Sequence, residues 1–280
     1  MDIDHKLLNQ AIDLYKKNVS LRQIQERLGI NRQKLSSVLT ELGIKTTVGN
    51  HYRRYFFDED YFHTIDTQDK AYWLGFFYAD GCVLPLNKDG YGEQAFKLAL
   101  AEKDRKVLED LKEDMHSTYP IRYDFSKHRK TPAHQVQVLL EQRSQKTVND
   151  LKDKGCVENK SLILEFPTGE QVPRTLIYHF IRGYMDGDGS IVLSQKGKQL
   201  YCTFDFVGTE SFIKSLSTFF SCGHVIKDKR KKNSWYFKIG DRAGCLTAGS
   251  LIYQNAHRYL KRKHDRFQQF ATKYGESQGS

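Results

Sequence analysis

The sequence predicts an α+β protein in which a small helical domain precedes two halves of similar design. Two observations predict this class. One apolar motif occurs twice, as residues 73–81 (Trp-Leu-Gly-Phe-Phe-Tyr-Ala-Asp-Gly) and residues 181–189 (Ile-Arg-Gly-Tyr-Met-Asp-Gly-Asp-Gly). Each copy also opens the same predicted order of helix, two strands, helix, two strands and helix. A repeated order of this length indicates two fused, pseudo-symmetric halves.

Composition points to a polyanionic partner. The 280 residues are 39% hydrophobic, which is enough to bury a core. Their net charge of +10 favours nucleic acid as the partner. A generically basic protein is the alternative. No run reaches about 18 uninterrupted apolar residues, and the N-terminus lacks signal-peptide features. We therefore expect no membrane partner and an intracellular location in the cytoplasm or nucleoid. The five widely spaced cysteines predict reduced thiols.

Residues 1–44 predict a helix-turn-helix domain. A first helix over about 4–17 is followed by helices over 21–28 and about 32–42, which Gly29 and Gly43 end. The last helix presents polar side chains suited to phosphates and base edges, namely Arg32, Gln33, Ser36 and Ser37. A helical packing module that does not touch DNA is the alternative.

Residues 45–65 predict a basic linker with interleaved aromatic residues. Arg53 and Arg54 would lie along a phosphate backbone if this segment is an extended arm. A solvated tether without DNA contact is the alternative.

The two halves follow as residues 66–166 and 167–273. In the first half, the motif helix is followed by strands near 82–86 and 94–101, a helix near 104–115, strands near 119–125 and 134–140, and a helix near 144–154. In the second half, a helix over about 174–186 is followed by strands near 190–194 and 200–207, a helix near 209–220, strands near 223–228 and 234–240, and a helix near 242–253. A basic helix over about 256–273 carries Arg258, Lys261, Arg262, Lys263 and Arg266, and residues 274–280 predict a disordered tail.

The motif itself predicts a close helix pair with two acids at its end. Gly75 with Ala79, and Gly183 with Gly187, form strips without large side chains that let two helix backbones approach. Asp80 and Asp188 then lie at two adjacent helix C-termini, where both the helix dipoles and their mutual repulsion are unfavourable. A divalent cation resolves both problems, and carboxylate oxygens suit Mg²⁺. Each Asp-Gly also fits a left-handed helix cap, which is the alternative for either copy taken alone.

These two stretches resemble the signature helices of the LAGLIDADG homing endonucleases, and the resemblance covers roughly residues 66–270. It implies two halves that form one saddle-shaped antiparallel sheet across duplex DNA. It also implies that Asp80 and Asp188 bind the catalytic metal, with Mg²⁺ as cofactor, Mn²⁺ as a possible substitute, and Ca²⁺ binding without cleavage. A monomer with one active centre would cut both strands across the minor groove and leave short 3′ overhangs.

The motif copies are not identical to each other or to the family pattern. The sixth position is Tyr78 in the first copy and Asp186 in the second, and Trp73 and Arg182 also depart from the plain pattern. The sixth position is not usually a metal ligand in this family. We therefore expect the difference to leave cleavage possible while making the two halves unequal.

Residues of the strands are candidates for catalysis and for DNA contact. Lys238, between Phe237 and Ile239, faces away from the core by strand alternation and matches a catalytic-lysine position of the family. Pairing strand 136–138 with strand 237–239 makes Gln137 its uncharged counterpart. DNA contacts are expected from outward strand residues and hairpin tips, namely Lys97, Arg122, Lys127, Arg129, Lys196, Lys198, Lys227, Lys229 and Arg230.

The predicted function is a site-specific double-strand DNA endonuclease. Two alternatives stay open at this stage: a non-cleaving DNA-binding regulator on the same scaffold, and an RNA-binding intron maturase. Both acids are present, which disfavours the regulator.

Overall fold

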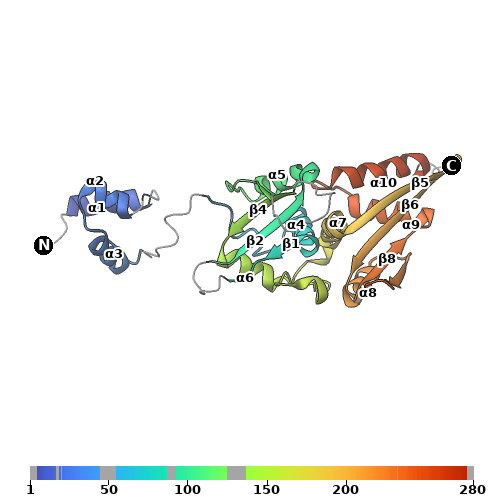
Figure 1. Ribbon diagram of the computed structural model, residues 1–280, viewed down its shortest axis with the longest axis horizontal. Coiled ribbons are helices and arrows are strands. Elements are labelled where there is room, and N and C mark those ends of the chain that lie inside the picture. Colours follow the sequence, from blue (N-terminus) through green and yellow to red (C-terminus); the bar gives the residue numbers. More distant parts are fainter. Residues whose placement is uncertain are drawn as a thin grey trace. The chain divides into compact units, whose positions relative to one another are not determined.

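The computed structural model describes residues 5–16, 19, 21–44, 55–86, 93–124, 137–231 and 233–275. The chain divides into two compact units, Met1–Phe56 and Phe57–Ser280 (Figure 1). The predicted linker residues 45–54 and the tail residues 276–280 lie outside the described part.

The small unit has three helices: α1 (His5–Lys16), α2 (Leu21–Leu28) and α3 (Arg32–Glu41). Gly29 and Gly43, which were predicted to end α2 and α3, both have positive φ angles. Asn31 caps α3, because its side chain accepts bonds from the backbone N–H groups of Gln33 and Lys34. A separate core joins the helices, made of Ala11, Tyr15, Ile24, Ile30, Leu35 and Leu39.

The first half of the large unit runs from α4 to α6. Its elements are α4 (Gln68–Ala79), β1 (Gly81–Val83), β2 (Ala95–Ala101), α5 (Arg105–Asp114), β3 (Arg122–Asp124), β4 (Gln137–Arg143) and α6 (Gln145–Asp153). The strands form an antiparallel sheet of order β1-β2-β4-β3. Thr67 and Ser144 cap α4 and α6 through their hydroxyl oxygens.

The second half repeats this arrangement. Its elements are α7 (Ile177–Asp188), β5 (Gly189–Lys196), β6 (Gln199–Gly208), α8 (Glu210–Ser217), β7 (His224–Lys227), β8 (Trp235–Ile239), α9 (Arg242–Tyr253) and α10 (Lys261–Tyr274). The sheet order β5-β6-β8-β7 corresponds strand for strand to the first sheet. The predicted α+β class with two repeated halves is therefore confirmed.

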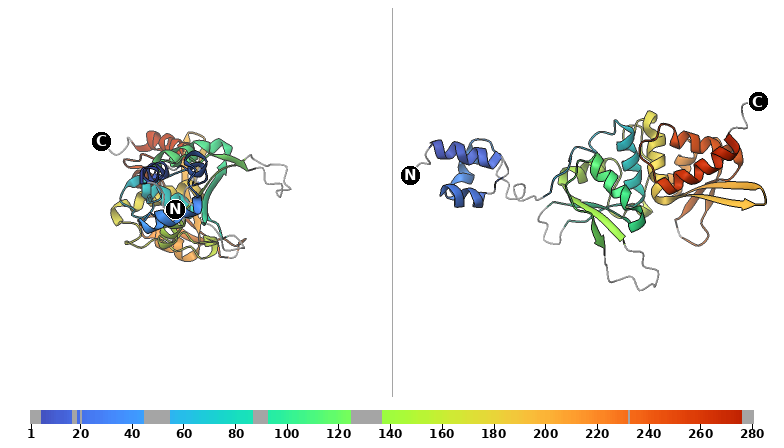
Figure 2. Two further views of the ribbon diagram at one scale, coloured as in Figure 1. Left: turned by 90° about the vertical axis from the view of Figure 1, so that its left-hand side faces the viewer. Right: turned by 90° about the horizontal axis from the view of Figure 1, so that it is seen from above.

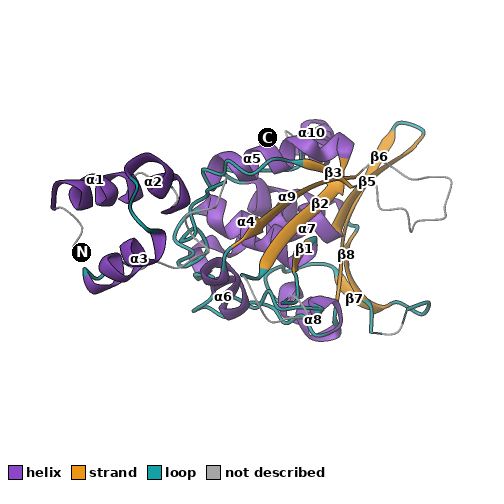
Figure 3. Ribbon diagram, turned by 60° about the vertical axis from the view of Figure 1, so that its left-hand side comes forward, coloured by secondary structure: helices purple, strands orange, loops and turns teal. Residues whose placement is uncertain are grey.

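Helices α4 and α7 lie side by side between the two sheets (Figures 1 and 2). In the large unit, the other helices cover one face of the strands, and the opposite face is open (Figure 3). Burial follows this division: in β4, Val138, Leu140 and Gln142 are buried and alternate with more exposed residues. The hydrophobic core therefore lies between the helices and one face of each sheet.

The segment before α4 differs from the prediction. Tyr61, Phe62 and Ile65 were assigned to the linker, but all three are buried in the core of the large unit. Phe62 packs edge-on against Phe77 of α4 at a ring-centroid distance of 5.3 Å. The apolar side chains need burial, so they anchor residues 57–65 to the first half.

Candidate metal centre and DNA-binding face

The contact between α4 and α7 depends on two reciprocal glycines. A Cβ on Gly75 would collide with the carbonyl oxygen of Phe180, and a Cβ on Gly183 would collide with the carbonyl oxygen of Tyr72. Phe180 and Tyr72 each lie three residues before the glycine of their own helix, so the contact is pseudo-symmetric. A Cβ on Gly187 would strike the methyl group of Ala79. The structure thus brings together all four residues predicted for the helix interface.

The contact between α4 and α7 around Gly75 and Gly183, here called the seam, also places the two acids together. Asp80 is the C-cap of α4, and Asp188 is the last residue of α7. A Cβ on Gly187, the residue before Asp188, would lie 3.2 Å from Oδ2 of Asp80. Both acidic side chains are exposed, and a cavity of about 320 Å³ adjoins Asp188. The acid pair is therefore open to a cation from solution.

The pKa values of both acids, Asp80 and Asp188, are raised above the usual value for aspartate. The surrounding protein atoms limit hydration and, together with the charge of Asp188, raise the pKa of Asp80 to about 6. Limited hydration likewise raises the pKa of Asp188, while nearby lysines oppose the rise. Their ionised forms are thus penalised in the metal-free protein.

The glycines after the acids act differently from the prediction. Gly81 and Gly189 begin β1 and β5, and neither has the positive φ angle of a left-handed cap. A Cβ on Gly81 would strike the side chain and backbone of Phe77, and one on Gly189 would strike Met185. Glycine is required here because each strand turns back tightly against the helix that precedes it.

One row of open-face residues crosses each sheet close to the acids. In the first half, Cys82 lies opposite Lys97, and Lys97 lies opposite Glu141. In the second half, Ser190 lies opposite Asp205, and Asp205 lies opposite Lys238. Cys82 and Ser190 are both two residues beyond a motif acid. We call these two rows the catalytic rows, after the role proposed for them below, and they place a lysine and a carboxylate in each half.

The catalytic rows correct one predicted pairing. The counterpart of Lys238 is Glu141, because each lies three residues before the cap of the following helix and opposite β2 or β6. Gln137 lies four residues earlier on β4, opposite Ala101 and Asp124. The sequence comparison missed this because it aligned strands by residue type, whereas register depends on hydrogen bonding and on the turn that follows. The lysine of the first half is Lys97, on the neighbouring strand.

The charges in the catalytic rows have opposite order. Lys238 Nζ lies 3.4 Å from an Asp205 oxygen, and the lysine side chain is 41% exposed. In the first half, Glu141 instead pairs with Arg143 at 2.9 Å. Lys97 is half-buried on β2 between the buried residues Phe96 and Leu98. Both lysines thus lie on the open face.

Most of the other predicted DNA contacts that can be placed are exposed. In the large unit these are Arg122, Lys196, Lys198, Lys227, Lys229 and Arg230, on or next to the strands. Arg32, Gln33 and Ser37 are exposed on α3, and Ser36 is half-buried. Arg53, Arg54, Lys127 and Arg129 lie outside the described residues. Lys227 rests on the Trp235 ring, and Arg230 pairs with Asp228.

Two buried lysines were not predicted as site residues. Lys160 and Lys263 are 7% and 3% exposed, and both donate to carbonyls around the motif acids. Burial lowers the pKa of Lys263 to about 8. Its spacing gave a signal, because Leu260, Lys263, Phe267 and Phe270 form one buried helical stripe. Lys160 gave none, since its short 3-10 turn (Lys160–Leu162) has no recognisable pattern.

The chain's own residues fit a hard divalent cation only in part. Within the described residues, no group of three or more His, Cys, Asp or Glu could hold a metal ion. Mg²⁺ commonly takes one or two protein carboxylates and completes its shell with water and substrate phosphates. Two exposed carboxylates with raised pKa values match that donor set.

Comparison with solved structures identifies the architecture. The large unit resembles the LAGLIDADG meganuclease I-AabMI, solved bound to uncleaved DNA, at a TM-score of 0.50 and 16% identity, over 74% of this chain and 90% of that one. The homing endonuclease I-GzeII, solved with its DNA target, matches at 0.50 and 15%, over 74% and 90%. I-SmaMI, solved with uncleaved DNA in the presence of calcium, matches at 0.50 and 14%, over 72% and 89%. No protein-family model matches the sequence, and no curated protein does either.

The chain has the LAGLIDADG fold. At identities this low the match concerns architecture alone, and α4 and α7 are its paired motif helices. In the described residues no helix is long and apolar enough to cross a membrane. The five cysteines are all free.

The sixth-position residues of the LAGLIDADG motifs have internal roles. Tyr78 donates to the carbonyl of Lys154 in the first half. Asp186 is buried and accepts bonds from the Tyr72 hydroxyl at 3.0 Å and from the Leu260 N–H at 2.6 Å. Neither residue shares the exposure of the acid pair. Both also cross the interface between the halves, because Asp186 binds Tyr72 of α4 and Tyr78 packs edge-on against Phe180 of α7.

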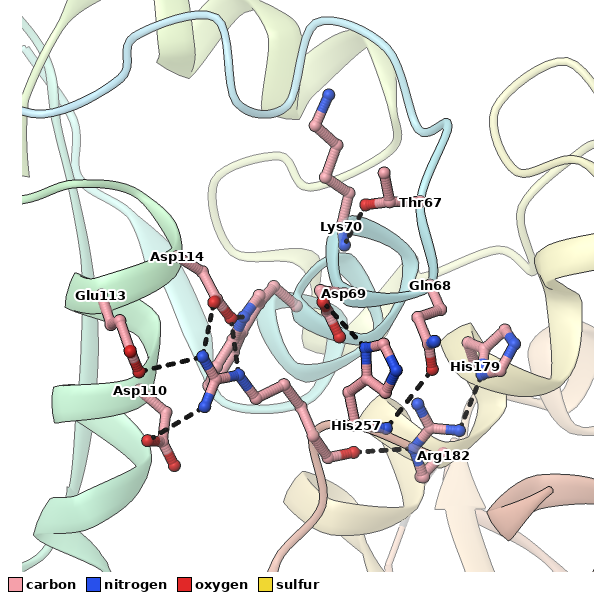
Figure 4. Close-up of polar contacts among 12 residues, drawn as sticks. Thr67, Gln68, Asp69, Lys70, Asp110, Glu113, Asp114, His179, Arg182 and His257 are labelled. Atoms are coloured by element: carbon pink, nitrogen blue, oxygen red, sulfur yellow. Dashed lines mark hydrogen bonds and ion pairs between the residues drawn. The ribbon is translucent and has the colours of Figure 1, made fainter. Parts of the chain in front are cut away.

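The other two departures from the LAGLIDADG pattern, Arg182 and Trp73, contact the two residues of an ion pair that joins the halves, Arg258 and Asp114 (Figure 4). Arg182 is fully buried and donates to the carbonyl oxygens of Ile252 and Arg258, both at 2.8 Å. Trp73 donates its indole N–H to Asp114 at 2.6 Å, and Asp114 also pairs with Arg258. These contacts join α5 of the first half to the segment before α10.

Proposed function

We propose that this protein is a site-specific, Mg²⁺-dependent double-strand DNA endonuclease that works as a monomer. The acid pair is the observation that carries the proposal. Asp80 and Asp188 are exposed, adjacent and electrostatically penalised at the ends of two tightly packed helices, an arrangement that folding alone does not favour. Solved proteins with the same fold, including I-AabMI and I-GzeII, were crystallised with DNA, which supports DNA as the substrate.

Asp80 and Asp188 would together hold the cation. The chemistry that such an ion would supply there is Lewis-acid polarisation of the scissile phosphate, activation of water and neutralisation of the leaving oxygen. Because Asp80 and Asp188 come from different halves of one chain, a single chain would suffice for both strands. Mn²⁺ would substitute for Mg²⁺. Ca²⁺ would permit binding without cleavage, in keeping with the I-SmaMI complex that holds uncleaved DNA in the presence of calcium.

Lys238 and Lys97 would support the reaction from the two catalytic rows. Each lysine would stabilise negative charge on the phosphate of the DNA strand nearest to it. Asp205, 3.4 Å from Lys238, pairs with that lysine and would hold it in place. In the first half Glu141 pairs with Arg143 instead, so Lys97 approaches DNA with a different set of neighbours.

DNA would lie along the open face of the two sheets. Exposed basic residues at the strand ends suit phosphate contacts, and Tyr123, Val192, Tyr201 and Ile226 are exposed apolar side chains suited to base edges. The helix-turn-helix unit would add affinity through its tether, with Arg32, Gln33, Ser36 and Ser37 in contact with DNA. Arg53, Arg54, Lys127 and Arg129 would add phosphate contacts.

Selection of cleaved sequences from a randomised or genomic DNA library tests this proposal. Libraries are incubated with the full chain and Mg²⁺, Mn²⁺, Ca²⁺ or EDTA, and fragment ends are sequenced. The expected result is one long consensus site cut on both strands in Mg²⁺ and Mn²⁺ but not in Ca²⁺ or EDTA. Enrichment of a bound sequence without any cut would indicate a DNA-binding regulator, and preference for structured RNA would indicate a maturase.

A further inference from the structure

Lys160 and Lys263 make matching contacts around the two motif acids. Lys160 Nζ lies 3.5 Å from the carbonyl oxygen of Ala79 and 2.5 Å from that of Gly81, the residues on either side of Asp80. Lys263 Nζ lies 3.5 Å from the carbonyl oxygen of Gly187 and 2.6 Å from that of Gly189, the residues on either side of Asp188. The two lysines therefore occupy equivalent positions in the two halves.

Both lysines lie in the helical segment that follows the last helix of the repeated order. Lys160 belongs to a short 3-10 turn after α6, and Lys263 lies in the first turn of α10, which follows α9, the counterpart of α6. The two segments differ in length, but each half places a lysine at the same point. A shared physical requirement at the motif acids explains why both segments carry a lysine there.

That requirement is charge. Each motif helix ends with unpaired carbonyls, a negative dipole end and a carboxylate, and the seam brings both ends together. A buried ammonium group needs compensation for its lost hydration, and the carbonyls and nearby acids supply it. Lys160 and Lys263 also act in the direction that lowers the pKa of both Asp80 and Asp188. Each lysine is thus close enough to influence both acids.

We propose that Lys160 and Lys263 are positioning residues that act as resident cations of the acid pair. They hold the two carboxylates side by side before any metal binds, without serving as ligands. The role rests on the proposed function, since a preformed acid pair is what a shared metal centre needs. The holding itself is a property of the metal-free protein and can be measured without DNA or cleavage.

The test is a double-mutant cycle on the full chain, measured by thermal unfolding in EDTA. Lys263→Met and Lys160→Met are each made in the natural background and in an Asp80→Asn/Asp188→Asn background. Methionine keeps the apolar stem and removes the charge. Arg266→Met is the matched control, because Arg266 also lies on α10 and donates to a backbone carbonyl, that of Ile191 at 2.8 Å.

If the lysines compensate the acids, each Lys→Met variant lowers the unfolding temperature more in the natural background than in the Asn background, by roughly 4 °C or more. Arg266→Met lowers it equally in both. A lysine variant that folds only in the Asn background supports the proposal equally. Equal losses in the two backgrounds would mean that the lysines only cap carbonyls, and would overturn it. Failure of both lysine variants to fold in either background would also overturn it.

The outcome is separable from the nuclease proposal. If the lysines and acids are coupled but the protein does not cleave DNA, the positioning role of the lysines holds and the nuclease proposal fails. Cleavage without coupling would keep the endonuclease and remove the positioning role.

Discussion

The two halves of the large unit share their geometry but differ in the chemistry next to the acids. Their sheets have the same strand order and register, and Asp80 and Asp188 are equivalent in position. The catalytic rows, however, carry Lys97 with Glu141 in one half and Asp205 with Lys238 in the other. The lysine is on β2 in the first half but on β8, the counterpart of the neighbouring strand β4, in the second half, and in both halves it belongs to the catalytic row. A fixed scaffold therefore preserves where the charges lie more strictly than which residue supplies them.

The buried lysines keep both residue type and position. Lys160 and Lys263 reach equivalent carbonyls from the helical segments that follow α6 and α9. The seam itself varies least, because Gly75 and Gly183 meet backbone carbonyls that no side-chain change can move. Where a backbone contact leaves no room for a side chain, as at Gly75 and Gly183, only glycine fits. Where a charge is needed, as in the catalytic rows, the residue that supplies it can differ between the halves.

The strongest test of the comparison removes one acid at a time. If the two acids hold one shared metal, as proposed, Asp80→Asn and Asp188→Asn should each lower the cleavage rate of both strands by about 10³-fold or more. Nicking and linearisation of a supercoiled plasmid carrying the selected site measure the two strands separately. DNA binding in Ca²⁺ serves as the control and should persist. Loss of only one strand's cleavage would show that each half holds its own independent centre.

The seam can be tested by one methyl group at each reciprocal position. Gly75→Ala and Gly183→Ala should each destabilise the large unit by roughly 3 kcal/mol, because the added methyl meets a backbone carbonyl of the partner helix. Chemical denaturation gives the free energy of unfolding. Gly169→Ala, at a position with nothing near its Cβ, should change it little. Clearly unequal losses for the two seam variants would contradict the pseudo-symmetry.

The inverted charges of the catalytic rows predict strand-specific effects. Lys238→Met should slow cleavage of one strand by roughly 10–100-fold, and Lys97→Met should slow the other by a similar factor, so that nicked plasmid accumulates. Gln137→Met should leave both rates within about threefold, since Gln137 lies four residues away from the catalytic row on β4. A large effect of Gln137→Met together with none of Lys97→Met would restore the pairing drawn from sequence alone.

Acidity should weaken the acid pair gradually. The pKa of Asp80 is raised to about 6, so protons compete with the cation below that pH, and cleavage should fall about tenfold per pH unit there. Stability has the opposite sign: without metal, the folded state binds more protons than the unfolded chain between about pH 4 and 6, so acid should stabilise the natural protein relative to Asp80→Asn. Cleavage rates and EDTA unfolding temperatures from pH 5 to 8 measure both. A flat cleavage profile would contradict the raised pKa.

Sequence alone determined the class, the repeat and the acids. Hydrophobic periodicity and the duplicated motif predicted both halves, because amphipathic spacing reflects which side of each element meets the core. The glycine strips predicted the seam, since only small residues permit such close helices. The spacing of Asp80 and Asp188 from those glycines then required the acids to meet.

Only the tertiary structure decided what surrounds the acids. Cross-strand register depends on hydrogen bonds between distant segments, and it replaced Gln137 by Glu141 and brought Lys97 into the catalytic row. Helical spacing signals that Lys263 is buried, but the placement of Lys263 and Lys160 beside the motif acids depends on how α10 and the turn after α6 pack there, which local sequence does not encode. The chain thus specifies its acids locally and their environment through long-range packing, because electrostatic partners are chosen by proximity in space.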